Sequence, residues 1–345
     1  MIRIAGFAAF ACLALSACDP SNNASVRDQI RAVGSSTVFP FAKAVAGQYV
    51  NKNPGTKSPI IESTGTGAGM KLFCAGVGAR HPDIVTASRR IKRAEFEQCR
   101  ENGVTNVVEI QIGLDGIAFA ESKRGEAIPL TALDVYKALA ANPFGKPQTA
   151  KTWKDVNPAL PDKAIKVYGP PSTSGTRDAL TELVLTRGCD VDPAMRALAD
   201  TNSGEHKKIC TTIREDGAFV EAGENDNLIV QKLAGDPNAL GVFGFSFLEE
   251  NLETLNGNSL NGVVPTYETV SNFTYPGARP LYIYVKGAHL NAIKGLKAYV
   301  AEFASAWNPD GYLKRAGMVV APSDIRAANA AQVTALKPLD PAELK

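Results

Sequence analysis

Three times along the chain, a short apolar run is followed by a polar loop and then by apolar residues at helical spacing. Short apolar runs bounded by turn residues predict buried strands, and apolar residues three or four positions apart predict helices. A chain that alternates strands and helices predicts an α/β fold with a mostly parallel sheet. The predicted strands cover residues 30–33, 59–61 and 165–168, and the predicted helices cover residues 38–52, 70–75 and 177–187.

The three loops between these strands and helices are rich in hydroxyls and glycine. The first turn of a helix has free N–H groups and a partial positive charge. Glycine lets the backbone approach a ligand closely, and Ser and Thr add hydroxyl donors. Each loop is therefore a candidate anion site. The first, second and third loops are Gly-Ser-Ser-Thr at 34–37, Glu-Ser-Thr-Gly-Thr-Gly-Ala-Gly at 62–69 and Gly-Pro-Pro-Ser-Thr-Ser-Gly-Thr at 169–176.

Helix capping is the simpler explanation for any one of these loops, because a Ser or Thr cap contributes ~1 kcal/mol and needs no ligand. Capping uses one hydroxyl, however, and all three loops carry more. In a parallel α/β sheet, ligands bind beyond the carboxyl ends of the strands, where these loops would lie. Two loops precede residue 70 and the third follows residue 165. The pattern therefore predicts two lobes that face each other across an anion-binding cleft.

The first residues predict a secretory signal rather than a part of the fold. Arg3 precedes an apolar run over residues 4–15, which is too short to span a membrane. The sequence Leu-Ser-Ala-Cys that follows resembles a bacterial lipobox, which implies a signal peptide over 1–17 and a lipidated Cys18. Ordinary cleavage near Ala17 is the alternative. We expect residues 18–25 to form a polar tether and the protein to lie in the periplasm or on the outer face of the cytoplasmic membrane.

Six cysteines fit this compartment. One leaves with the signal peptide and one would carry lipid, so four remain in an oxidising environment. Pairing near neighbours predicts the disulfides Cys74–Cys99 and Cys189–Cys210, although four cysteines allow three pairings. A zinc site is disfavoured, because no Cys-x-x-Cys occurs and the histidines are scattered. The cysteines are residues 12, 18, 74, 99, 189 and 210, and the histidines are residues 81, 206 and 289.

Composition narrows the function classes. The 345 residues suggest about two domains at ~150 residues each, and 45% hydrophobic residues allow a packed core. The net charge of +2 gives no reason to expect a nucleic-acid partner. The basic cluster at 89–93 is followed at once by Glu95 and Glu97, as on a solvated helix face.

The sequence offers no evident catalytic machinery. Residues 65–71 lack the Gly-Lys-Ser/Thr ending of a nucleotide-binding loop, and no Gly-x-Ser-x-Gly elbow occurs. A Ser-His-Asp triad would need one of only three histidines, and His206 lies in a polar stretch. We expect a binding protein without catalysis, metal or cofactor.

Six segments occur in the order seen in the substrate-binding proteins of bacterial phosphate ABC transporters, and the resemblance spans roughly residues 28–290. It implies a monomeric, two-lobed periplasmic-binding-protein fold of type II that closes over one phosphate. It also implies a partner permease in the membrane. The implied domain I covers 26–114 and 277–345, and domain II covers 115–276. The segments are GSSTVFPF (34–41), STGTGAGMK (63–71), PDIVTASRRI (82–91), LDGIAFA (114–120), STSGTRDAL (172–180) and ALGVFGFSF (239–247).

The resemblance also implies which residues hold phosphate, and two charges depart from the family pattern. The best-known members have Asp where this chain has Arg89, and Arg where it has Pro170 and Pro171; Arg177 follows instead. We expect Arg89 and Arg177 to neutralise the anion, the alternative being salt bridges elsewhere. The other implied phosphate ligands are Ser36, Thr37, Val38, Thr66, Ser88, Ser174, Gly175 and Thr176.

Selectivity needs a carboxylate, because phosphate near neutral pH carries a proton and sulfate does not. A carboxylate can accept a hydrogen bond from the protonated phosphate oxygen, and it would repel sulfate. Such a charged hydrogen bond contributes ~1.5–3 kcal/mol. The candidates, in descending preference, are Asp115, Asp83 and Asp226; a cap, a hinge hydrogen bond or a surface charge is the alternative for each. A receptor for another oxyanion such as sulfate or arsenate stays open, as does a surface phosphate-ester hydrolase.

Overall fold

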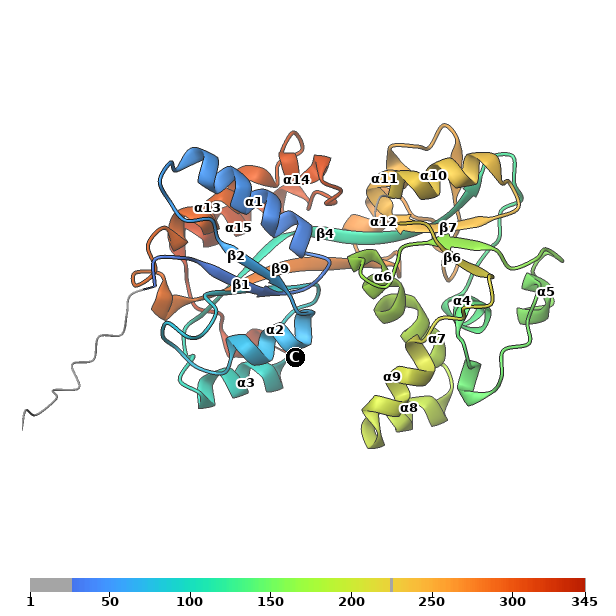
Figure 1. The fold of residues 1–345 in the computed structure, drawn as a ribbon, viewed down its shortest axis with the longest axis horizontal. Helices are drawn as coiled ribbons and strands as arrows, with labels where there is room; N and C mark the ends of the chain where they lie inside the picture. The colour runs from blue at the N-terminus through green and yellow to red at the C-terminus, as the bar shows by residue number, and fades with distance from the viewer. Residues whose placement is uncertain (1–26, 224–225, 345) are drawn as a thin grey trace, which may run out of the picture.

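The computed structural model describes residues 27–223 and 226–344, which form two lobes joined by two long strands (Figure 1). Its sheet runs in the order β2-β1-β3-β9-β4-β7-β5-β6, and β8 pairs with β4. The strands are β1 Arg31–Gly34, β2 Ile60–Ser63, β3 Ile84–Ala87, β4 Val107–Ser122, β5 Val167–Gly169, β6 Phe219–Glu221, β7 Leu240–Gly244, β8 Leu255–Gly257 and β9 Ala278–Lys286.

The expectation of a mostly parallel sheet holds only in part, because four strand pairs are parallel and four are antiparallel among the described residues. β1 pairs in parallel with β2 and β3, and β5 pairs in parallel with β6 and β7. β4 and β9 are antiparallel to each other, because the chain crosses to the second lobe along β4 and returns along β9. The sheet is therefore mixed, and each antiparallel pair involves β4 or β9: β3 with β9, and β4 with β7, β8 and β9.

Helices cover the sheet in both lobes (Figure 1). Lobe I carries α1 Phe39–Lys52, α2 Thr66–Phe73, α3 Arg93–Glu101, α13 Leu296–Ala306, α14 Tyr312–Arg315 and α15 Ser323–Ala335. Lobe II carries α4 Ala132–Leu139, α5 Trp153–Val156, α6 Gly175–Ala179, α7 Thr186–Cys189, α8 Pro193–Thr201, α9 Ser203–Thr211, α10 Asp226–Gly235, α11 Phe245–Glu249 and α12 Tyr267–Ser271.

Two of the three predicted helices differ in detail from the prediction. α2 begins at Thr66, four residues earlier than predicted, and its Gly69 packs directly on β1: an added Cβ would lie 2.6 Å from the Cα of Gly34. The third helix changes its winding, since a π-helical turn at Leu180–Leu185 separates α6 from α7. π-helical turns are rare and often occur at functional sites.

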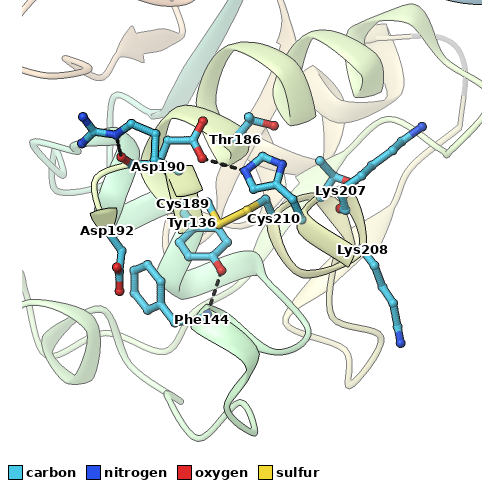
Figure 2. Close-up of a disulfide and its surroundings, with 12 residues drawn as sticks. Tyr136, Phe144, Thr186, Cys189, Asp190, Asp192, Lys207, Lys208 and Cys210 are labelled. Carbon is cyan, nitrogen blue, oxygen red and sulfur yellow. Dashed lines mark hydrogen bonds and ion pairs between the residues drawn. A yellow bond between two sulfur atoms is a disulfide. The ribbon is translucent and has the colours of Figure 1, made fainter. Parts of the chain in front are cut away.

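Both predicted disulfides are present. Cys74–Cys99 joins the end of α2 to α3, and Cys189–Cys210 joins α7 to α9 (Figure 2). His206 lies beside the second disulfide and its Nε2 is 2.7 Å from Asp190 Oδ1. Both sulfurs of this cluster are used in the disulfide, so the cysteines are not available as metal ligands in this structure.

The signal peptide, the tether and the lipidation at Cys18 fall outside the described residues. Within residues 27–223 and 226–344, no helix has the length and apolar character needed to cross a bilayer.

Candidate functional site

A groove of about 1000 Å³ lies between the lobes and brings all three hydroxyl-rich loops to one place. It is lined from lobe I by the first and second loops and from lobe II by the third. The loops meet because β1, β2 and β5 end at the facing edges of the lobes. The sequence-predicted residues on its wall are Ser36, Thr37, Asp115, Ser174, Gly175, Thr176 and Asp226.

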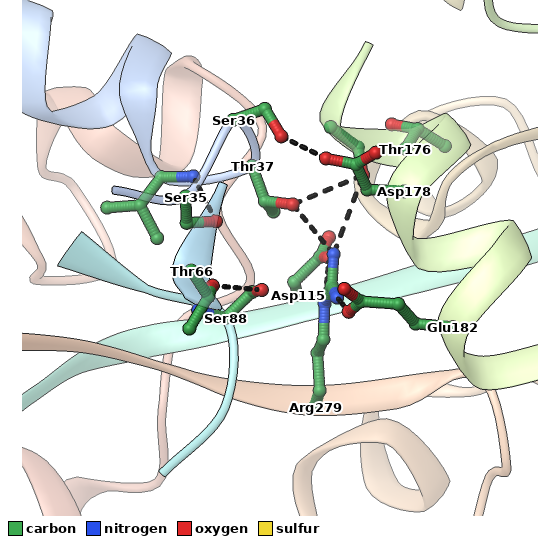
Figure 3. A network of polar contacts seen from close by, with 12 residues as sticks. Ser35, Ser36, Thr37, Thr66, Ser88, Asp115, Thr176, Asp178, Glu182 and Arg279 are labelled. Carbon is green, nitrogen blue, oxygen red and sulfur yellow. Dashed lines mark hydrogen bonds and ion pairs between the residues drawn. The ribbon is translucent and has the colours of Figure 1, made fainter. Parts of the chain in front are cut away.

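The two lobes touch directly across this groove. The Thr37 hydroxyl donates to the Gly175 carbonyl oxygen at 3.1 Å, and the Ser36 hydroxyl donates to Asp178 (Figure 3). A Cβ on Gly175 would lie 2.3 Å from the Cα of Thr37, so only glycine allows this approach. The structure therefore has the lobes closed on each other at the predicted anion site.

The remaining predicted donors of lobe I lie just behind the groove. Thr66 Oγ1 and Ser88 Oγ are 3.0 Å apart, and the Ser88 N–H donates to Thr66 Oγ1 at 3.1 Å. Both side chains are buried. Ser88 lines a second hollow of about 640 Å³ on the other side of the interlobe contact. The predicted donors are thus divided between two spaces.

Helix capping accounts for part of the hydroxyl content. The Ser35 hydroxyl accepts the Val38 N–H at 3.3 Å, and the Ser174 hydroxyl accepts the Thr176 N–H at 3.2 Å. Ser36 and Thr37 instead bond across the groove. Capping therefore accounts for Ser35 and Ser174, and it does not account for Ser36 and Thr37.

Neither arginine proposed from the sequence points into the groove. Arg89 forms two hydrogen bonds to Glu95, at 2.7 and 2.9 Å, which raise the pKa of its guanidinium. Arg177 donates to the Pro170 carbonyl at 2.8 Å, and burial lowers the pKa of its guanidinium. Its guanidinium carbon lies 4.5 Å from the ring centre of Phe219. The salt-bridge alternative describes both residues better than the anion-facing one.

The arginine between the lobes is Arg279, which the sequence analysis missed. It is 4% exposed and donates to Asp115 at 2.9 Å, to Glu182 at 2.7 Å and to Thr37 Oγ1 at 2.7 Å (Figure 3). Its position follows from the register of the connecting strands, which pairs Asp115 of β4 with Arg279 of β9. The available signal was that both residues lie where the chain crosses and returns.

Two of the carboxylates expected from the sequence to accept the phosphate proton, Asp83 and Asp226, differ in their surroundings. Asp83 is fully buried in lobe I, where it accepts from Arg27 and His289, each at 2.6 Å, so it does not line the groove. Asp226 lines the groove and accepts the Gly244 N–H at 2.8 Å.

The fourth carboxylate, Asp178, was not selected from the sequence. It lines the groove and accepts from Ser36. Within residues 27–223 and 226–344, no Lys, Arg or His lies within ion-pair distance of it.

Two lobes, two connecting strands and a polar groove between them define a two-lobed binding protein. In agreement, residues 19–306 match the model of the PBP superfamily domain. The phosphate-binding protein PstS of Staphylococcus saprophyticus is 30% identical over 300 residues, which are 84% of this chain and 81% of the relative. The chain therefore belongs to the PBP superfamily and, within it, to the family of the substrate-binding proteins of phosphate ABC transporters.

Two further similarities agree. Protein SphX of Synechococcus elongatus is 32% identical over 75% of this chain and 68% of its own length. The crystal structure of a possible phosphate binding protein from Planctomyces limnophilus covers 89% of this chain and 98% of that chain, with a TM-score of 0.70 and 27% identity. An ABC-type phosphate transport receptor from Vibrio cholerae, at 18% identity and a TM-score of 0.57, shows the same fold.

Proposed function

We propose that this chain captures inorganic phosphate outside the cytoplasm and delivers it to an ABC transporter permease. The observation that carries the proposal is the meeting of three hydroxyl- and glycine-rich loops, from two lobes, in one groove. PstS relatives, named as phosphate-binding proteins, support phosphate as the ligand. The proposal includes a lipid anchor at Cys18, a monomeric state and the domain bounds 26–114 with 277–345 and 115–276.

The proposed ligand shell consists mainly of neutral donors. Hydroxyls and backbone N–H groups in a closed, poorly hydrated site hold an anion by directed hydrogen bonds, each worth roughly 1.5–3 kcal/mol toward a charged partner. Capping bonds at Val38 and Thr176 would have to weaken or be shared when the anion enters. The proposed ligands are Ser36, Thr37, Val38, Thr66, Ser88, Ser174, Gly175 and Thr176. In the closed structure, Arg89 and Arg177 point to other partners.

Selectivity would come from Asp178. A carboxylate without a cationic partner at an anion site repels any fully deprotonated anion that approaches it. Hydrogen phosphate has a protonated oxygen that can donate a hydrogen bond to the carboxylate, whereas sulfate has no such donor. Asp178 is better placed for this than Asp83, which lies away from the groove, or Asp115, which Arg279 already neutralises.

Catalysis finds less support than binding. The groove is lined by hydroxyls, amides and carboxylates, and no His or Cys is among its described lining residues. The relatives are named as binding proteins and receptors. A phosphate-ester hydrolase would need an activated nucleophile in the groove, so a phosphatase assay with a chromogenic ester distinguishes the two classes.

Calorimetry tests the proposal. The chain from residue 24 onward, secreted so that its disulfides form and stripped of bound anion, is titrated with phosphate, arsenate and sulfate. We expect tight phosphate binding, similar arsenate binding and no detectable sulfate binding. Equal binding of sulfate would make the chain a general oxyanion receptor, and no binding of any of the three would overturn the proposal.

A further inference from the structure

One guanidinium lies at the centre of the proposed ligand shell. Arg279 contacts Thr37, which lines the groove, and itself lines the second hollow together with Ser88. The proposed donors therefore flank Arg279 on both sides. Its side chain is almost completely buried, so its charge acts where water screens it little.

Arg89, Arg177 and Arg279 lie near the proposed donors, and each has a carboxylate partner outside the ligand shell. Arg187 also lines the second hollow, but it donates to the Pro276 carbonyl oxygen. Arg89 and its partner are six residues apart and belong to one local turn. Arg279 and its partner are 97 residues apart and come from different elements. Only Arg279 also donates to a residue of the proposed shell. The pairs are Arg89–Glu95, Arg177–Glu221 and Arg279–Glu182.

The two carboxylates on Arg279 are not equivalent. Asp115 comes from the neighbouring connecting strand and its side chain is 14% exposed. Glu182 comes from the π-helical turn of lobe II and its side chain is 55% exposed. Asp115 is thus a fixed partner within the sheet, while Glu182 can turn to solvent at little cost.

We propose that Arg279 is the cation that neutralises the bound anion, and that Glu182 holds the anion's place on the guanidinium when the site is free. The inference rests on the proposed function. A carboxylate and a phosphate present similar oxygen pairs to the planar fork of an arginine. Arg279 with Asp115 and Glu182 carries a net charge of −1, which disfavours a further anion; release of Glu182 to solvent removes that obstacle.

Three matched substitutions test this inference: Glu182→Gln, Glu221→Gln and Glu95→Gln. Each keeps the side-chain shape and removes one carboxylate charge from one of the three arginines. If Arg279 binds the anion, Glu182→Gln should raise phosphate affinity by about tenfold, because the competing charge is gone. Glu221→Gln and Glu95→Gln should leave it within about twofold of wild type. Calorimetry with inorganic phosphate gives all four constants, and thermal melts check folding.

The outcomes separate this inference from the proposed function. A wild type that binds no phosphate overturns both. A wild type that binds phosphate, with Glu182→Gln neutral or weaker, overturns the inference alone, because Glu182 would then only hold the lobes together. A rise with Glu221→Gln or Glu95→Gln instead would assign the cation to Arg177 or Arg89.

A second variant tests the guanidinium itself. Arg279→Lys keeps the charge but loses the fork, and we expect phosphate affinity to fall by about thirtyfold or more. Asp115→Asn removes only the partner within the sheet and should preserve the gain caused by Glu182→Gln in a double variant. Loss of that gain would mean that Arg279 acts through the connecting strands and not on the ligand.

Discussion

The two walls of the groove differ in charge. The lobe I wall presents neutral hydroxyls, and the buried pair Thr66 and Ser88 lies just behind it, already bonded to each other. The lobe II wall presents two acids, Asp178 and Asp226, and a third acid, Glu182, lines the second hollow. A neutral, preorganised wall accepts any tetrahedral oxyanion, whereas an acidic wall discriminates among them and opposes closure without the right ligand. Under the proposed function, both lobes would contribute to affinity, and selectivity would depend mainly on the lobe II wall.

The largest expected effect comes from blocking contact between the walls. Gly175→Ala places a methyl group 2.3 Å from the Cα of Thr37, so the closed arrangement cannot form. We expect phosphate affinity to fall at least about a hundredfold, or ~2.7 kcal/mol, because closure can be driven only by ligand contacts made in the closed form. Calorimetry measures the loss, and small-angle scattering should show the variant open even with phosphate.

A matched control is Gly235→Ala, at the end of α10, where an added Cβ meets nothing within 4 Å. It should bind like wild type. Tight binding by Gly175→Ala would show that the walls do not need to touch.

The lobes also differ in the charge that each buries. In lobe II, burial raises the pKa of Glu121 to about 7, and neither carboxylate oxygen has a hydrogen-bond partner among the described residues. The folded state then holds a proton that the unfolded chain releases above its ordinary pKa near 4.5. Stability therefore falls as pH rises from about 4.5 to 7, by roughly 2 kcal/mol.

Glu121→Gln should abolish this dependence, as measured by thermal melts between pH 4.5 and 8. In lobe I, burial lowers the pKa of Lys286 to about 8. The free-energy cost of burying its charged ammonium therefore disappears, and stability rises, as pH rises from about 8 to 10.5. Lys286→Met should flatten only that alkaline range. If Glu121→Gln kept the wild-type dependence of stability on pH between 4.5 and 7, this dependence would not come from Glu121.

Selectivity should depend on the lobe II wall. Asp178→Asn keeps the shape but replaces a proton acceptor without a cationic partner by an amide that can donate to sulfate. We expect the ratio of phosphate to sulfate affinity to fall about tenfold to thirtyfold, or ~1.4–2 kcal/mol. Competition calorimetry at pH 7 measures it. Asp226→Asn, on the same wall but bonded to the Gly244 N–H, should change the ratio little; the reverse result would make Asp226 the selective group.

The smallest expected effect lies in lobe I, behind the wall of the groove. Ser88→Ala removes one hydroxyl from a neutral set, which should cost about fivefold in phosphate affinity, or ~1 kcal/mol, without altering selectivity. Ser174→Ala on lobe II removes a helix cap as well, so it should lower both affinity and the melting temperature. An equal fall in melting temperature for the two variants would contradict this expected difference between the lobes.

Much of the fold and part of the site could be predicted from the chain itself. The α/β alternation, the hydroxyl-rich loops, the family and both disulfides follow from short segments, because turn chemistry, helix starts and cysteine spacing are local properties. The antiparallel pairing of β4 with β9 was not predicted, since it depends on a return of the chain more than 160 residues later.

The sequence by itself determined where hydroxyls and free N–H groups would gather, because these groups belong to the backbone turn that carries them. Only the tertiary structure decided which charges lie at the proposed site. Arg89 and Arg177 lie within the recognised motifs, yet they turn to Glu95 and to Pro170. Asp178 lines the groove and Arg279 lies beside it in the second hollow, because lobe contact and strand register bring them there. A long charged side chain follows its nearest partner in space, and that partner is set by the fold.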